Sequence, residues 1–184
     1  LAEEKLAGYP EAILYVAGYM GRKYFLRNNY NVAPDFDYPV QNPTVIRARE
    51  MSEFVVEKFK KGELDEVYLV YTFMHSTISL EPTFTKLLPL DPDELKKELV
   101  VSGSSSKKID NSIIYEPSPE SVLDVLIQKY VKGILYGALV EAFTSEQSAR
   151  MTAMDSATSN ADDMLYELNL HYNRARQANI TQEI

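Results

Sequence analysis

The carboxyl-terminal third of the chain, residues 118–184, reads SPESVLDVLIQKYVKGILYGALVEAFTSEQSARMTAMDSATSNADDMLYELNLHYNRARQANITQEI. Pro119 stands at its start, no proline follows, and its last glycine is Gly137. This pattern predicts one continuous helix, because proline and glycine are the residues that most strongly interrupt helices. At about 1.5 Å per residue the helix would be roughly 100 Å long. A helix of that length must project into solvent or pair with a partner outside the domain.

Small and apolar residues recur within this helix at alternating spacings of three and four. They are Met154, Ala157, Ala161, Met164, Leu168, His171, Ala175 and Ala178. This spacing is typical of a heptad seam that faces another helix, and its alanines let that helix approach closely. The remaining positions are mostly polar or charged. We therefore interpret the stretch as a shaft that pairs with one helix and turns polar faces to other partners. A homodimeric coiled-coil adaptor stays open as an alternative.

Composition excludes several classes of protein. The chain has 184 residues, of which 45% are hydrophobic, enough for one domain plus an extension. Its net charge of −8 has the wrong sign for a general nucleic-acid-binding protein. With no cysteine, and with His75 and His171 not at metal-ligand spacing, we expect no metal site. No stretch reaches the roughly 20 apolar residues that span a membrane, so we expect a soluble, cytoplasmic protein without lipid insertion.

Residues 1–117 alternate between short apolar runs and helical segments. Strands are predicted over residues 11–17, 32–38, 66–73 and 113–115, with a further extended segment over 78–88. Helices are predicted over residues 1–8, 20–29 and 44–61, the last with Thr44 as N-cap and Gly62 at its end. Strands that alternate with helices indicate an α/β domain with a mainly parallel, Rossmann-like sheet over residues 1–117. The long helix over residues 118–184 would form a second domain.

Three groups of residues are weighed as sites of chemistry. Gly18 and Gly21 follow a predicted strand, but they match only half of a dinucleotide-binding glycine pattern. A nucleotide-binding, Rossmann-like enzyme is therefore an alternative, and glycines that shape a tight turn are favoured. His75 lies beside Ser76 and Thr77 without a nucleophile elbow, which favours a surface histidine. The carboxylates at 63, 65 and 66 are interpreted as a solvated turn. We expect no cofactor.

Several stretches of the sequence are specific enough to compare with known families. The most specific are YNRARQANITQEI at 172–184, and SEQSARMTAM at 145–154 followed by ATSN at 157–160. Further stretches are GELDEVYLVY at 62–71, EPT at 81–83, LLPL at 87–90 and YEP at 115–117. Together they resemble the gamma subunit of the F-type ATP synthase, which is the rotor of its central stalk. The resemblance covers the whole chain in order. The sequence lacks the regulatory cysteine pair of the chloroplast form, and in this respect it is similar to bacterial members of the family.

The resemblance implies a subunit that transmits torque between the ion-translocating membrane ring and the catalytic alpha–beta hexamer and has no catalytic site of its own. It assigns contacts with the beta subunit to Arg176, Gln177, Thr181 and Glu183. It assigns contacts with the c-subunit ring to Tyr115 and Glu116. The epsilon subunit would dock on the α/β domain, near residues 66–73. The location implied is the cytoplasmic face of the cell membrane, as a peripheral part of the complex.

The long helix would, by this resemblance, be half of an antiparallel coiled coil. The family's other half is an amino-terminal helix that precedes a strand with a glycine-rich turn, and neither is found in this sequence. The chain begins at Leu1 without methionine and stops at Ile184 within the family's carboxyl-terminal motif. We therefore expect a fragment that is truncated at both ends.

Overall fold

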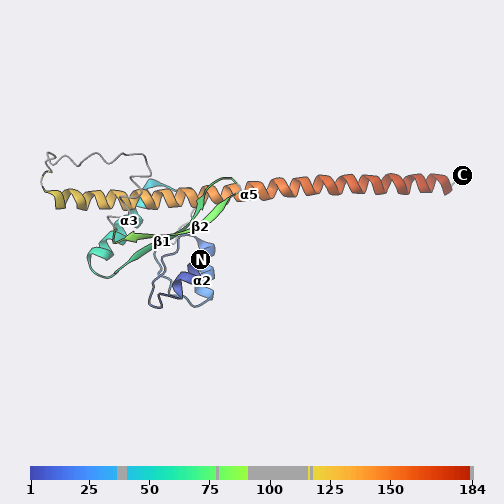
Figure 1. The fold of residues 1–184 in the computed structure, drawn as a ribbon. Coiled ribbons are helices and arrows are strands. Elements are labelled where there is room, and N and C mark those ends of the chain that lie inside the picture. Colours follow the sequence, from blue (N-terminus) through green and yellow to red (C-terminus); the bar gives the residue numbers. More distant parts are fainter. Residues whose placement is uncertain (37–40, 78, 91–115, 117, 183–184) are drawn as a thin grey trace.

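The computed structural model describes residues 1–36, 41–77, 79–90, 116 and 118–182. These residues form a body and a helix that runs along the body and projects far beyond it (Figure 1). The elements are, in order, α1 (Ala2–Leu6), α2 (Tyr19–Arg27), α3 (Val45–Lys60), β1 (Val67–Met74), β2 (Leu80–Leu88) and α5 (Pro119–Gln182). The predicted long helix is confirmed as α5, with 64 residues.

Helix α3 begins and ends where its local chemistry predicts. The Thr44 hydroxyl oxygen accepts a hydrogen bond from the Arg47 backbone N–H at 3.3 Å, which makes Thr44 the N-cap. At the other end, the Gly62 N–H donates to the Phe59 carbonyl, and the N–H of the next residue donates to the Lys58 carbonyl. This is a Schellman motif, which needs a left-handed residue, and Gly62 has φ of 72°.

The described sheet consists of β1 and β2, paired antiparallel from Tyr68↔Lys86 to Met74↔Leu80. The predicted strand at 66–73 and the extended segment at 78–88 are thereby confirmed as strands. A short turn joins them, in which the His75 N–H donates to the Ser79 carbonyl at 3.1 Å. Such a turn can link only antiparallel neighbours, because parallel strands need a crossover of a dozen or more residues.

The mainly parallel, Rossmann-like sheet is not formed by the described residues. Parallel pairing among them is limited to one bridge, Leu14↔Val32, in place of the strands predicted at 11–17 and 32–38. The strands predicted at 11–17 and 32–38 are therefore not confirmed, and Phe36, with φ of 64°, is not in extended backbone. An apolar run carries no information on which strand it pairs with. Residues 37–38 and the strand predicted at 113–115 lie outside the described residues. The coarser prediction, a mixed α/β chain with a long carboxyl-terminal helix, is confirmed.

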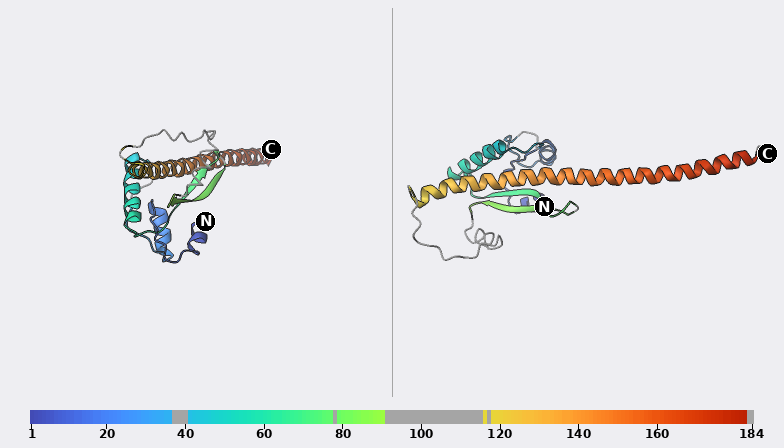
Figure 2. Two further views of the ribbon diagram at one scale, coloured as in Figure 1. Left: turned by 60° about the vertical axis from the view of Figure 1, so that its left-hand side comes forward. Right: turned by 90° about the horizontal axis from the view of Figure 1, so that it is seen from above.

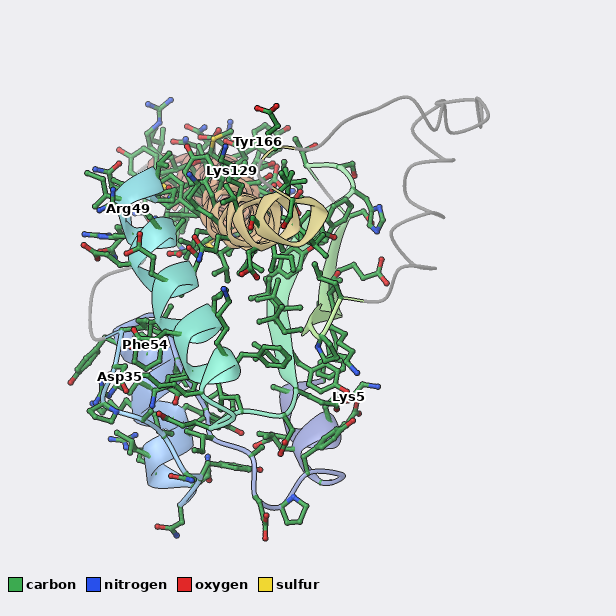
Figure 3. The ribbon with its side chains drawn as sticks, turned by 90° about the vertical axis from the view of Figure 1, so that its left-hand side faces the viewer. Lys5, Asp35, Arg49, Phe54, Lys129 and Tyr166 are labelled. Carbon is green, nitrogen blue, oxygen red and sulfur yellow. The ribbon has the colours of Figure 1, made fainter. Side chains whose placement is uncertain are left out.

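The hydrophobic core lies where α5 crosses the body. Viewed along α5, helix α3 lies on one side and the β1–β2 sheet on the other (Figure 3). The core is built from α3, β2 and α5, and its buried members are Ala48, Met51, Val55, Val56, Leu87, Leu88, Val131 and Leu135. Val131 and Leu135 are 0% and 4% exposed. The first half of α5 is therefore part of the same core as α3 and β2.

Aromatic contacts attach residues 1–36 to this core at two places. The Phe54 ring of α3 packs edge-on against Tyr15 and Phe36, with ring centroids 5.3 and 5.2 Å apart. At the sheet, the hydroxyl groups of Tyr9 and Tyr68 are 3.2 Å apart and share a hydrogen bond. The amino-terminal segment is thus held mainly by ring contacts rather than by a continuous sheet.

We expect Gly62→Ala to lower the free energy of unfolding by about 1–2 kcal/mol, because a Cβ is disfavoured at positive φ. The space around Gly62 is open, so the cost is one of backbone conformation alone. Gly133→Ala is the matched control, because this helical glycine also has open space and should gain about 0.5–1 kcal/mol. Urea unfolding measures the free energy of unfolding of both variants. Equal changes of the same sign would contradict the assignment of Gly62 as a residue that must adopt a positive φ.

Candidate functional site

Helix α5 divides into an anchored part and a projecting part. Its buried residues are Val131, Leu135, Ala138 and Ser145. From Ala149 to Gln182 every residue is exposed in the structure. At 1.5 Å per residue this projecting part is roughly 50 Å long. The right-hand view of Figure 2 shows it leaving the body as a rod with no other described element beside it.

The predicted heptad seam lies in the projecting part, and its side chains are exposed to solvent. Met154, Met164 and Leu168 are 64%, 65% and 64% exposed. Large apolar side chains are seldom left in such a row unless another surface covers them, because their burial is worth about 1.5–3 kcal/mol each. The described residues do not supply a cover, so the helix partner of the seam stays a prediction.

Two of the residues predicted to contact the beta subunit lie on the other side of α5. At about 100° per residue, Arg176 and Gln177 fall opposite Ala175 and Ala178 of the seam, whereas Thr181, three residues after Ala178, lies at the edge of the seam. The Thr181 hydroxyl donates to the Gln177 carbonyl within the helix at 2.8 Å. Glu183 lies outside the described residues. The helix thus separates an apolar face from a polar face along the same turns.

The residues predicted to contact the membrane ring lie at the opposite end of α5. Glu116 is exposed and precedes the first turn of the helix, while Tyr115 lies outside the described residues. The 60 residues between 116 and 176 correspond to on the order of 90 Å of helix. The two predicted contact regions are therefore far apart, and one rigid element joins them.

Comparison with known proteins identifies the family. A family model described as ATP synthase matches residues 1–184. The chain is 54% identical over 182 residues to the ATP synthase gamma chain of Acetivibrio thermocellus. The aligned residues cover 99% of this chain and 62% of that relative. The chain belongs to the ATP synthase gamma family. The resemblance inferred from residues 145–160 and 172–184 is thereby confirmed.

Two further comparisons bear on this gamma-family chain. The gamma chain of Ruminiclostridium cellulolyticum is 56% identical over 185 residues, covering 100% of this chain and 62% of that relative. The chain therefore spans 62% of the length of both relatives. A solved structure of the Euglena gracilis mitochondrial ATP synthase rotor has TM-score 0.51 and 17% identity, and covers 89% of this chain and 61% of that one. That likeness shows the fold.

Two of the three carboxylates considered for acid–base chemistry, Glu63 and Glu66, form ion pairs. The Lys58 ammonium donates to Glu63 at 2.7 Å and lowers the pKa of that carboxyl. Lys86 donates to Glu66 at 2.6 Å, and this bond, followed by one from the Tyr68 hydroxyl, lowers the pKa of Glu66. Carboxyl groups with a lowered pKa are ionised at neutral pH and cannot serve as proton donors there. The solvated-turn interpretation accounts for both.

His75 is a surface histidine at the end of β1, as the sequence favoured. Its side chain is 50% exposed, and its Nε2 atom lies 2.5 Å from a carboxylate oxygen of Glu81. The ring also packs edge-on against Phe73, at a centroid distance of 4.8 Å. These two contacts hold the imidazole at the end of the hairpin formed by β1 and β2.

Gly18 and Gly21 have roles that require no ligand. Gly18 precedes α2 with φ of 98°, a conformation that favours glycine. At Gly21 an added Cβ would lie 3.2 Å from the Val16 side chain, so the glycine permits close packing. Among the residues that the structure describes, no cluster of three or more potential metal ligands occurs. No described helix is long and apolar enough to cross a membrane.

One pair of residues escaped the sequence analysis. Ser145 is 2% exposed, and its hydroxyl donates to the Thr72 carbonyl of β1 at 3.5 Å. Ser148, one helical turn later, donates to the Thr77 carbonyl at 3.0 Å. Ser145 and Ser148 continue the face of α5 on which Leu135 and Ala138 are buried. This helical spacing was the signal in the sequence that could have predicted their contact with the body. Their partners lie more than 70 residues away, which no local pattern reveals.

We expect Leu135→Ala to lower the free energy of unfolding by about 2–4 kcal/mol, because this side chain is buried in the core. The matched change Leu170→Ala, on the exposed projecting part and away from the seam, should alter it by less than about 0.5 kcal/mol. Urea unfolding of both variants tests whether the anchored part of α5 belongs to the core. A similar loss in the two variants would refute that division.

Proposed function

We propose that this chain is the shaft-bearing part of an ATP synthase rotor, without a catalytic site of its own. In this role it transmits torque between the ion-translocating membrane ring and the catalytic alpha–beta hexamer during ATP synthesis or hydrolysis. One observation supports the proposal most directly. In this member of the ATP synthase gamma family, the 64-residue helix α5 is anchored in the body over its first half and exposed over its second half. A torque-bearing part needs both an attachment and a reach, and α5 has both.

A lone helix is a poor shaft, and the exposed seam indicates how it is reinforced. We propose that α5 is half of an antiparallel coiled coil and that Met154, Ala157, Ala161, Met164, Leu168, Ala175 and Ala178 face the second helix. The curated relatives are longer than this chain, which leaves room in the full protein for that helix. The alanines favour close approach, so the pair would be thin as well as stiff.

The same reasoning applies to the sheet. The Leu14↔Val32 bridge is a parallel pairing one residue long, and β1 has its described partner on one edge. An additional strand from the longer protein would pair along these segments and complete a mainly parallel, Rossmann-like sheet. On this proposal residues 1–117 form the α/β domain and residues 118–184 the shaft.

The partners follow from the position of each surface. Arg176, Gln177, Thr181 and Glu183 would contact the beta subunit, with Arg176 and Gln177 on the face of α5 opposite the seam. Polar contacts suit a shaft that must move between catalytic sites, because they give specificity without a deep apolar anchor. Tyr115 and Glu116 would contact the c-subunit ring at the other end. The epsilon subunit would dock on the α/β body near β1, and the alpha subunits would surround the shaft.

The proposed location is the cytoplasmic face of the cell membrane, where the protein would be a peripheral part of the ATP synthase complex. It would be held there through the c-subunit ring rather than through lipid. No cofactor is assigned to this chain, because the nucleotide chemistry of the complex would take place in the catalytic hexamer.

Reversing one charge on the proposed beta-subunit face tests the proposal. We expect Arg176→Glu to lower coupled ATP synthesis in the reassembled complex on the order of tenfold, because a reversed charge at a polar interface is repelled. Lys129→Glu makes the same charge change on an exposed position in the anchored part of α5 and should leave turnover nearly unchanged. Circular dichroism should show both variants folded. Unchanged synthesis with Arg176→Glu would count against the role.

The exposed seam also favours one other function, a homodimeric coiled-coil adaptor. Sedimentation of the protein at the full length of its relatives separates the two. We expect a monomer at low micromolar concentration, with the seam filled by its own second helix. Leu168→Lys should then lower the melting temperature by several degrees, while Tyr166→Lys, on the face away from the seam, should not. A stable dimer that Leu168→Lys dissociates would establish the adaptor instead.

A further inference from the structure

The β1–β2 hairpin touches α5 at the last point where the body holds the helix. Ser148 is the last residue of α5 before the fully exposed stretch that starts at Ala149. Its hydroxyl donates to the carbonyl of Thr77, in the turn of the hairpin. One turn earlier the buried Ser145 hydroxyl donates to the carbonyl of Thr72. We call these two residues the serine clamp.

The two contacts of the serine clamp restrict the axial and rotational position of α5 on the hairpin. Contacts between apolar side chains are individually non-directional, so their register depends on how the side chains interdigitate. A hydroxyl–carbonyl hydrogen bond needs both a short distance and the right angle. The Ser148 bond is 3.0 Å long, whereas the Ser145 hydroxyl makes a longer contact of 3.5 Å. Because both residues lie on one face of α5 and meet carbonyls at two points of the hairpin, Ser148 supplies the main directional restraint and Ser145 a weaker one on the same face.

The carbonyl that Ser148 binds lies beside a set of hydrogen bonds that join the described residues of the hairpin end. The N–H groups of His75 and Ser76 both donate to the Ser79 carbonyl, at 3.1 and 3.2 Å. The Ser79 N–H donates in return to the Ser76 carbonyl at 3.2 Å and to its hydroxyl at 3.0 Å. Across the mouth of the turn, His75 pairs with Glu81. These bonds tie His75, Ser76 and Ser79 together next to the carbonyl that Ser148 binds.

We propose that Ser145 and Ser148 are positioning residues that fix the rotational register of α5 on the body, at the site where torque passes between them. This inference rests on the proposed rotor function, because a register matters most where the helix is turned. The projecting part acts as a lever roughly 50 Å long, so a small slip at the clamp is enlarged at its far end. The serine clamp limits that slip.

Hydrogen exchange tests the contact itself, without reference to ATP. In Ser148→Ala, we expect the backbone amides of residues 72–77 to exchange roughly twofold to tenfold faster. This is the loss of protection expected when one hydrogen bond is removed. Ser148→Thr keeps a hydroxyl and should restore the exchange rate. Thr152→Ala is the matched control, because its hydroxyl donates only within α5, to the Ser148 carbonyl at 3.1 Å. Unchanged exchange in Ser148→Ala would overturn the proposal.

The assembled complex tests the role in torque transfer. We expect the double variant Ser145→Ala/Ser148→Ala to assemble and to hydrolyse ATP, but to pump fewer ions for each ATP hydrolysed. Ser145→Ala/Ser148→Thr should recover part of that ratio, which a loss of stability alone would not predict. Faster exchange with an unchanged pumping ratio would overturn the torque role of the clamp. A wild-type chain, extended to full length, that fails to assemble would instead refute the proposed rotor function.

Discussion

The structure depends on the burial of one face of α5 between α3 and the sheet. Val131 and Leu135 enter the core beside Val55, Val56 and Leu87, and this contact joins elements that are far apart in sequence. Neither α3 nor the two-stranded sheet has enough apolar surface to be stable alone. Helix α5 is therefore the element on which the body forms, as well as the element that leaves it. The same residues anchor the helix and complete the core.

This constraint separates the helix into parts with opposite requirements. In the anchored part, apolar residues meet the body, and Ser145 and Ser148 end that contact with directional bonds. In the projecting part, helix propensity and pairs at spacings of three and four are the main local support, and they are worth only a few tenths of a kcal/mol each. The exposed apolar seam indicates that stability in this part comes from outside the described residues.

The sequence predicted features that depend on neighbouring residues, and it did not predict contacts between segments that are far apart in the chain. The length of α5 followed from the lack of proline after Pro119, and the ends of α3 followed from Thr44 and Gly62, because each depends on neighbours within one turn. The direction of the sheet did not follow, because an apolar run such as 66–73 pairs equally well in either direction. Its pairing was decided by the turn after β1. The serine clamp was hidden for a related reason, since its partners lie in a distant hairpin.

On the proposed rotor role, the two faces of the projecting part would allow a shaft to be both stiff and reversible in its contacts. Ala175 and Ala178 carry the seam, while Arg176 and Gln177 point to the opposite side of the same turns. Stiffness needs permanent contact along the helix, which apolar close packing supplies. Rotation past successive sites needs contacts that break and re-form, and exposed polar groups in water do so at small net cost. One helix meets both requirements because a period of 3.6 residues separates the two kinds of contact.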